Sequence, residues 1–226
     1  MHIFVTGGSG FVGQHLVRRL VRAGHEVRAL ARTDSAADLV ARVGAEPVFG
    51  DLADLVNGTP PQWTSALRGI DAVVHGAAYM AFWGRDDMFR RTNLDPTVAF
   101  HQAAASAAVP RFVLISAASV SSGTQRAPVV DERTAEGRPN VAYSRIKLET
   151  ERILLSAVTP TMTTVALRPP FIWGAGMSTL DDFVAAVETG RFSWIDNGRR
   201  TVDFVHVDNL AEAAYLALTA GRAGRT

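Results

Sequence analysis

A cluster of glycines near the amino terminus constrains the fold of this chain more than any other feature. Four glycines fall within residues 7–13 of IFVTGGSGFVGQHLVRRL, between an apolar strand-like run and an amphipathic helical segment. Glycine permits a tight turn, lets backbone amides approach a pyrophosphate, and lets the helix pack closely on the strand. The helix N-terminus adds N–H groups and a positive dipole. The turn predicts a dinucleotide site, with an ordinary glycine-rich turn as the alternative. The residues expected at that site are Gly7, Gly10, Phe11, Val12 and Gly13.

Strand-like and helical segments alternate along the first 170 residues. Six short apolar runs, from HIFVT to TVALRPP, are separated by segments of helical periodicity. Such alternation predicts right-handed βαβ units and a parallel sheet covered on both faces. We therefore expect an α/β, Rossmann-type doubly wound fold. Residues 1–170 would form an NAD(P)-binding domain with the catalytic groups, and residues 171–226 a partial substrate lobe interleaved with it.

The composition excludes several kinds of function. The formal net charge is +1 and the arginines are scattered, so nucleic acid is not an expected partner. The absence of cysteine excludes disulfides, thiolate catalysis and cysteine–metal sites, and no metal is expected. No apolar run approaches about 18 residues and no secretory leader precedes the first strand, so we expect a cytoplasmic enzyme without a membrane partner.

The ends of the second and third expected strands bear on the choice between NAD and NADP. NAD-binding folds place an acid after the second strand to bind the ribose hydroxyls, but EVRALART offers Arg32 and no acid until Asp34. Arginine suits the extra phosphate of NADP, so NADP is the expected cofactor and NAD the alternative. Arg32 could equally be a solvated surface residue. Asp51, after the third strand, would accept a bond from the adenine amino group or simply cap the next turn.

A tyrosine and the only lysine of the chain lie four residues apart in AYSRIKLET. On a helix, Tyr143 and Lys147 project from the same face. A free tyrosine has a pKa near ~10, and a neighbouring ammonium together with an oxidised nicotinamide would lower it. The hydroxyl could then exchange the proton that accompanies hydride transfer. The spacing predicts a catalytic pair in contact with the cofactor, with an exposed pair of no consequence as the alternative.

Several further motifs occur in a recognisable order. TGGSGFVG matches a T-G-x-x-G-x-x-G turn, YSRIK matches Y-x-x-x-K, LRPPFIWG matches L-R-P-x-x-I-x-G, and FVHVDNLAEA matches F-V-H-V-D-D-x-A-x-A. GDLAD and HGAA stand where an adenine-site aspartate and the loop after the fourth strand are expected, and NLDPT differs from N-x-x-G-T by Pro96. Over nearly its whole length the chain resembles the extended short-chain dehydrogenases/reductases, the NAD-dependent epimerase/dehydratase superfamily.

The resemblance implies roles for individual residues. Tyr143 would be the general acid/base, Lys147 would lower its pKa and hold the ribose, and Asn93 would be a supporting polar residue near the cofactor. Further residues that the matched segments place at the cofactor are Leu52, Ala77 and Pro170.

The active-site serine departs from the family pattern. The family's Ser or Thr stands three residues before a valine, and in LISAASV that position is Ala117. Ser119 lies two residues further on, and side-chain alternation in an extended strand end would point it the same way. Ser116 is the other candidate, and either serine could bond local backbone instead. We expect Ser119 to be the catalytic serine.

The segments around the expected pocket favour an apolar substrate. YMAFWG, FIWG and RFSWID are aromatic, although core packing accounts for part of this. AFWGRDDMFRRTN resembles a segment of the 3β-hydroxysteroid dehydrogenase-like and 2-alkyl-3-ketoalkanoate reductase branch. The Asp–Glu pair of nucleotide-sugar 4,6-dehydratases is replaced here by Ala118 and Ser119. The asparagine that faces the substrate diphosphate in sugar-nucleotide enzymes is replaced by Phe171.

The leading hypothesis is an NAD(P)-dependent oxidoreductase that acts on a secondary alcohol or ketone of a hydrophobic small molecule. The alternatives are a nucleotide-sugar epimerase with tightly bound NAD and a non-catalytic dinucleotide sensor. The helical segments 86–108 and 141–157 are candidates for a homodimer interface. Members of the family usually continue with another strand and further elements that complete the substrate pocket, so the chain is either unusually short or trimmed.

Overall fold

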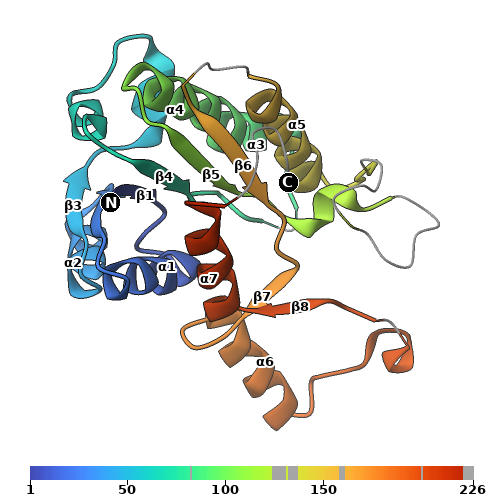
Figure 1. Cartoon of the computed structure of the whole chain (residues 1–226). Coiled ribbons are helices and arrows are strands. Elements are labelled where there is room, and N and C mark those ends of the chain that lie inside the picture. Colours follow the sequence, from blue (N-terminus) through green and yellow to red (C-terminus); the bar gives the residue numbers. More distant parts are fainter. Residues whose placement is uncertain (82, 124–130, 132–136, 158–160, 200, 221–226) are drawn as a thin grey trace.

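A six-stranded parallel sheet forms the centre of the structure (Figure 1). The computed structural model describes residues 1–81, 83–123, 131, 137–157, 161–199 and 201–220. The strands are β1 (His2–Thr6), β2 (Glu26–Ala31), β3 (Glu46–Phe49), β4 (Ala72–His75), β5 (Arg111–Ile115) and β6 (Thr163–Leu167). Their order is β3-β2-β1-β4-β5-β6, so the strand order reverses beside β1 and the sheet is doubly wound, as predicted.

Helices cover both faces of this sheet. The helical segments up to β6 are α1 (Phe11–Arg22), α2 (Asp34–Arg42), η1 (Leu52–Asn57), η2 (Gln62–Leu67), α3 (Asp86–Phe89), η3 (Arg90–Leu94), α4 (Asp95–Ser106), η4 (Ala118–Ser121) and α5 (Ala142–Ser156). After β6 follow α6 (Ser178–Glu188) and η5 (Ile195–Gly198), which project away from the sheet (Figure 1), and α7 (Val207–Ala217), which packs on it. Successive residues of a strand point to opposite faces. In β1, Ile3 and Val5 pack with α1, α2 and α7, whereas Phe4 packs with η2, α4 and α5. Burial of these two apolar clusters holds the helices against the sheet.

Beyond β6 the chain leaves the sheet and then returns to it. β7 (Phe171–Trp173) and β8 (Phe204–His206) pair in parallel as a separate two-stranded sheet. α7 then packs along α1, where Arg19 pairs with Glu212 and lies over the Tyr215 ring at 3.8 Å from its centroid. The segment after residue 170 thus contributes a projecting part and a helix of the core, and the domain boundary at that residue stays a prediction.

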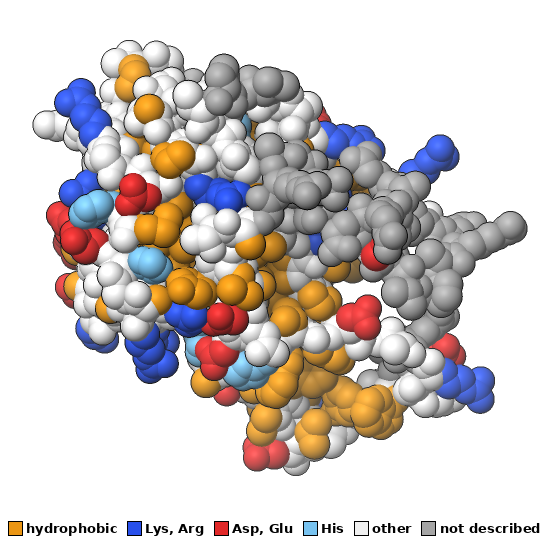
Figure 2. Space-filling model, in the orientation of Figure 1, with side chains coloured by type: hydrophobic (Ala, Val, Ile, Leu, Met, Phe, Trp, Pro, Cys, Tyr) orange, Lys and Arg blue, Asp and Glu red, His pale blue; other side chains and the backbone are white. Residues whose placement is uncertain are grey.

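The projecting part carries many exposed apolar side chains, which Figure 2 shows as an orange area below the sheet. They include Phe171, Trp173, Leu180, Phe183, Val184, Val187, Trp194, Val202 and Phe204. An exposed apolar area of this kind is typical of a surface that binds a ligand or contacts a membrane or another protein. Within the described ranges, no helix has the length and apolarity that crossing a bilayer requires.

Candidate active site

The residues predicted to form the site follow the carboxyl ends of the parallel strands. The glycine turn follows β1, Arg32 follows β2, Asp51 follows β3 and Ala77 follows β4. The two candidate serines follow β5, and Pro170 follows β6. Carboxyl ends of parallel strands meet at one edge of the sheet, which is where open α/β folds bind ligands. The fold therefore gathers these residues along a single edge.

The glycine turn is packed as the dinucleotide prediction requires. Gly7 has a φ of +75°, and a Cβ there would lie 2.7 Å from the amide nitrogen of Ala77 in the loop after β4. A Cβ on Gly13 would overlap the carbonyl oxygen of Gly7, so only glycine lets α1 begin so close to the turn. Gly10 is the exposed N-cap residue, and its amide donates to the Gly7 carbonyl at 3.1 Å.

The start of α1 is suited to an anion. No side chain caps the helix at Gly10, and its first turn contains no acidic residue. Phe11 and Val12, the first two residues of the helix, are half-buried. Uncapped amides and a positive helix end fit the pyrophosphate of a dinucleotide.

Arg32 and Asp51 lie next to each other at the ends of β2 and β3. Arg32 Nη1 is 3.8 Å from Asp51 Oδ2, and the two side chains are 74% and 41% exposed. Asp51 also caps η1, since its Oδ1 accepts from the Ala53 amide at 3.0 Å. The capping role considered for Asp51 is therefore realised, while its second oxygen faces Arg32. Leu52, the first residue of η1, is half-buried against the core.

The loop after β4 is held by a buried polar network that the sequence did not reveal. His75 Nδ1 lies 2.8 Å from Thr6 Oγ1, and His75 Nε2 lies 2.9 Å from Thr97 Oγ1. The Ala77 amide donates to the same Thr6 hydroxyl at 3.3 Å. Burial lowers the pKa of His75 to about 3, so the imidazole is neutral. A sign of this network in the sequence is His75 itself, a single polar residue at the end of the apolar strand β4.

Asn93 fastens the same loop from the helical side. It lies in η3, a π-helical segment between α3 and α4, where the sequence predicted an uninterrupted helix. Its Oδ1 accepts from the Tyr79 amide at 2.7 Å and its Nδ2 donates to the Tyr79 carbonyl at 2.9 Å. Such π-bulges occur frequently at functional sites. In this structure Asn93 is 5% exposed and its side chain orders the loop.

Tyr143 and Lys147 lie on α5, as predicted. Lys147 is buried, donates from Nζ to the Ile115 carbonyl at 3.0 Å, and lies 5.9 Å from the centroid of the Tyr143 ring. Burial lowers the pKa of Lys147 to about 8, although Glu151 opposes this. Burial of the phenol in the protein alone raises the pKa of Tyr143, because removal from water disfavours its charged form. The lowering of that pKa expected beside an oxidised nicotinamide stays a prediction.

The two candidate serines have different surroundings. Ser116 is buried and donates to Glu151 Oε2 at 3.2 Å, and the Glu151 carboxylate also accepts from Arg168 Nε at 2.8 Å. Ser119 is exposed and accepts a bond from Ser144 at 2.8 Å. Ser116 therefore belongs to a buried ion-pair network, whereas Ser119 is an exposed residue whose hydroxyl is bonded to Ser144.

The backbone around Ser119 differs from the extended strand end that the sequence predicts. Residues 118–121 form the 3-10 turn η4, so side chains there do not alternate, and the prediction of a strand end is wrong. The half-buried Ala117 precedes this turn, and the Ala118 amide donates to the Pro169 carbonyl at 2.8 Å. That bond joins η4 to the loop that contains the half-buried Pro170.

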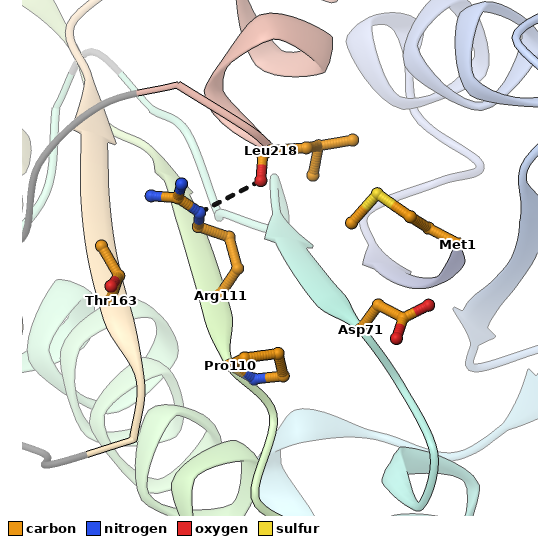
Figure 3. A pocket seen from close by; sticks show the side chains of 6 residues that line it. All are labelled: Met1, Asp71, Pro110, Arg111, Thr163 and Leu218. Carbon is orange, nitrogen blue, oxygen red and sulfur yellow. Dashed lines mark hydrogen bonds between the residues drawn. The ribbon is translucent and has the colours of Figure 1, made fainter.

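A hollow at the opposite edge of the sheet is separate from this site (Figure 3). It measures about 490 Å³ and is lined by Met1, Asp71, Pro110, Arg111, Thr163 and Leu218. Arg111 Nε donates to the Leu218 carbonyl at 3.1 Å. These residues lie at the amino ends of the strands and the end of α7, away from the glycine turn. Among the described residues, no group of three or more His, Cys, Asp or Glu side chains is placed to hold a metal ion.

Comparison with known proteins finds similarity to a family of NAD-dependent enzymes. Residues 3–226 match the NAD dependent epimerase/dehydratase family. The chain is 36% identical over 226 residues to the 4-hydroxy-2-methyl-3-oxo-4-farnesyl-3,4-dihydroquinoline-1-oxide ketoreductase of Stigmatella aurantiaca, covering 99% of this chain and 66% of that protein. It is 36% identical over 227 residues to the 2-alkyl-3-oxoalkanoate reductase of Stenotrophomonas maltophilia (strain K279a), covering 97% and 66%.

A solved structure gives the same fold. The dTDP-glucose 4,6-dehydratase DesIV from Streptomyces venezuelae, with NAD and TYD bound, superposes with a TM-score of 0.81 at 27% identity. The match covers 99% of this chain and 74% of that one. The chain spans 66% of the length of the two reductases named above.

Proposed function

Because the chain belongs to the NAD-dependent epimerase/dehydratase family of extended short-chain dehydrogenases/reductases, we propose that it reduces a ketone of a hydrophobic substrate to a secondary alcohol with NADPH. The observation that carries this proposal is the pair on α5, in which the half-buried phenol of Tyr143 lies beside the buried Lys147, with Nζ 5.9 Å from the ring centroid. Ketone reduction needs a proton donor at the carbonyl oxygen, and a protonated phenol next to an ammonium can serve as one. Both relatives named above are reductases by name.

The residues at the glycine turn and after β2 fit NADP. The uncapped start of α1 would hold the pyrophosphate, and Gly7 and Gly13 leave room for close approach. Arg32 is largely exposed and its contact with Asp51 is a long surface ion pair, which is worth little. The guanidinium can therefore turn to a ribose phosphate, beside the hydroxyls of Thr33 and Ser35 at the start of α2.

The side chains would share the chemistry as follows. The bound cofactor supplies a hydride to the carbonyl carbon. Tyr143 donates its proton to the carbonyl oxygen, and Ser119 holds that oxygen with a hydrogen bond. Lys147 supplies positive charge and donors for the cofactor ribose below its pKa of about 8. Ser116 takes no part, because Glu151 already binds its hydroxyl.

The surroundings of the site support an apolar substrate. Tyr79, Trp83 and Trp173 are 49%, 89% and 45% exposed, on the segments that follow β4 and β6. Phe171, at the position where sugar-nucleotide enzymes place an asparagine, is 40% exposed. Aromatic surfaces of this kind offer apolar contact area to alkyl or isoprenoid groups, and Phe171 offers no hydrogen bond to a sugar diphosphate. The substrate class we propose is therefore a ketone with a long apolar substituent.

The proposal is tested by cofactor titration followed by turnover. NADPH and NADH are titrated separately into the purified chain by cofactor fluorescence, and we expect NADPH to bind at least about tenfold more tightly. NADPH oxidation is then measured with ethyl 2-octylacetoacetate, a 2-alkyl-3-oxo ester with a long apolar substituent, with Tyr143→Phe as the control. Turnover that survives in Tyr143→Phe contradicts the role of the phenol. A preference for NADH, or NAD retained through purification, favours the epimerase.

A further inference from the structure

Ser144 stands directly after the tyrosine in the sequence and makes an unusual contact. Its side chain is buried, with 4% of the residue exposed, in the first turn of α5. Its Oγ donates a hydrogen bond to Ser119 Oγ at 2.8 Å. The bond joins two segments that the fold brings together from 25 positions apart in the sequence, α5 and the turn η4. A residue without a predicted role thus touches the serine expected to hold the substrate oxygen.

Other hydroxyls on the same helix behave differently. Thr150 Oγ1 donates to the Ile146 carbonyl at 2.8 Å, and Ser156 Oγ donates to the Ile153 carbonyl at 3.1 Å. A bond back to the preceding turn is the usual choice of Ser and Thr inside a helix. Ser144 lies in the first turn of α5, where no preceding helical turn offers a carbonyl, and its proton is directed across to η4. This bond ties the Ser119 hydroxyl to α5.

The donor direction of this bond determines what Ser119 can do. A serine hydroxyl has one proton and two lone pairs. Ser144 gives its proton to one lone pair of Ser119, so the proton of Ser119 is not used in this contact. Ser119 is exposed at the carboxyl edge of the sheet, where it can donate that proton outward.

We propose that Ser144 is a positioning residue that fixes Ser119 as a hydrogen-bond donor to the carbonyl oxygen of the substrate. This inference rests on the proposed function. It also accounts for the alanine at position 117, where the family normally has its serine: the hydroxyl has moved to Ser119, on a 3-10 turn, and Ser144 holds it in place there. The pair Ser119–Ser144 then performs the task that one serine on a strand end performs in relatives.

The test compares Ser144→Ala, Ser119→Ala and the double variant in the NADPH-oxidation assay with ethyl 2-octylacetoacetate. Alanine favours the helix, so Ser144→Ala should keep the fold. We expect Ser119→Ala to lower kcat about 100-fold and Ser144→Ala about tenfold, with KM and NADPH affinity unchanged. In the double variant Ser144→Ala should cause no further loss, because its effect passes through Ser119. Ser144→Thr, which keeps the hydroxyl, should recover most of the rate.

Thr150→Val is the matched control. It removes another buried hydroxyl from α5 without touching Ser119, so its kcat should equal that of the wild type. If Ser119→Ala lowers kcat and Ser144→Ala does not, the positioning role is wrong and the proposed function stands. If the wild type turns over and Ser119→Ala leaves kcat unchanged, the assignment of Ser119 itself fails.

A structural readout does not depend on turnover. In a crystal structure of Ser144→Ala, we expect the Ser119 side chain to occupy more than one rotamer, whereas in the wild type it occupies one. An unchanged single rotamer of Ser119 in the variant would overturn the inference.

Discussion

The buried lysine provides the sharpest test of the electrostatics of the site. Lys147 is 5% exposed, and burial lowers its pKa from 10.5 to about 8. A lowered pKa means that the folded state disfavours the ammonium relative to the unfolded state. The penalty is therefore fully present below pH 8 and is relieved as the pH rises from about 8 toward 10.5. We expect Lys147 to make the protein more stable as the pH rises through this window.

The size of the effect follows from the shift. A lowering from 10.5 to about 8 corresponds to about 3 kcal/mol at pH 7, at 1.36 kcal/mol for each pKa unit. About 2 kcal/mol of this should be regained by about pH 10, where the unfolded chain also begins to lose the proton. Lys147→Met removes this pH-dependent contribution to the free energy of unfolding. It also removes the bond to the Ile115 carbonyl, but that loss does not depend on pH.

Two measurements check the prediction. The chain has a single lysine, so the ¹³Cε signal of labelled lysine in an NMR titration reports Lys147 without assignment. Its midpoint should lie near pH 8. In urea unfolding, the free energy of wild type minus that of Lys147→Met should rise by about 2 kcal/mol between about pH 7 and 10. Arg18→Met removes an exposed cation and should show no such rise. A lysine midpoint at or above 10 would refute the argument from burial.

Three further predictions concern the cofactor edge and the core. Arg32→Ser should weaken NADPH binding about tenfold or more and leave NADH binding nearly unchanged, measured by fluorescence titration; equal loss for both cofactors would refute a phosphate contact. Gly13→Val should abolish binding of both cofactors, since a side chain there meets the Gly7 carbonyl; retained affinity in the same titration would contradict the packing. Arg168→Met removes the 2.8 Å ion pair that Arg168 makes with the buried carboxylate of Glu151 and should lower the free energy of unfolding by about 3 kcal/mol, whereas a loss below about 1 kcal/mol would mean that the other partners of Glu151 compensate.

The fold could be predicted because its signals are local and repeated. The alternation of apolar runs and helices, with the glycine turn first, is sufficient to predict a doubly wound sheet. Gly7, Arg32, Asp51 and Ala77 each follow the end of a strand, so their place on one edge of the sheet can be predicted without knowledge of any contact. The course of a helix could not be predicted where a tertiary contact of one side chain accompanies a change in the local backbone. The helix expected over 86–108 contains the π-helical η3, within which Asn93 bonds the Tyr79 backbone, a contact with a segment that the helical periodicity does not report.

The places of the candidate site residues along the sheet edge could be predicted from the sequence, but the surroundings of their side chains could not. The alternation rule behind Ser119 required a strand, and η4 is a turn, so the rule did not apply to this segment. The pKa of Tyr143 was predicted from a charge four residues away, yet the phenol is also desolvated by tertiary neighbours such as Phe89, whose ring lies edge-on at 5.9 Å. Burial, and the partner of a side chain such as Ser144, depend on segments far away in the sequence.

The isolated lysine in an arginine-rich chain now has a physical explanation. Position 147 is buried, and the acceptor that binds its side chain is the Ile115 carbonyl at the end of β5. A guanidinium has five N–H donors in a rigid plane and cannot lose its charge, so arginine would bring more buried donors than one carbonyl satisfies. An ammonium is compact and gives up its proton at moderate cost. The same burial that lowers the pKa of Lys147 raises that of Tyr143. Below about pH 8 the pair therefore consists of a charged ammonium and a protonated phenol, which is the combination that ketone reduction requires.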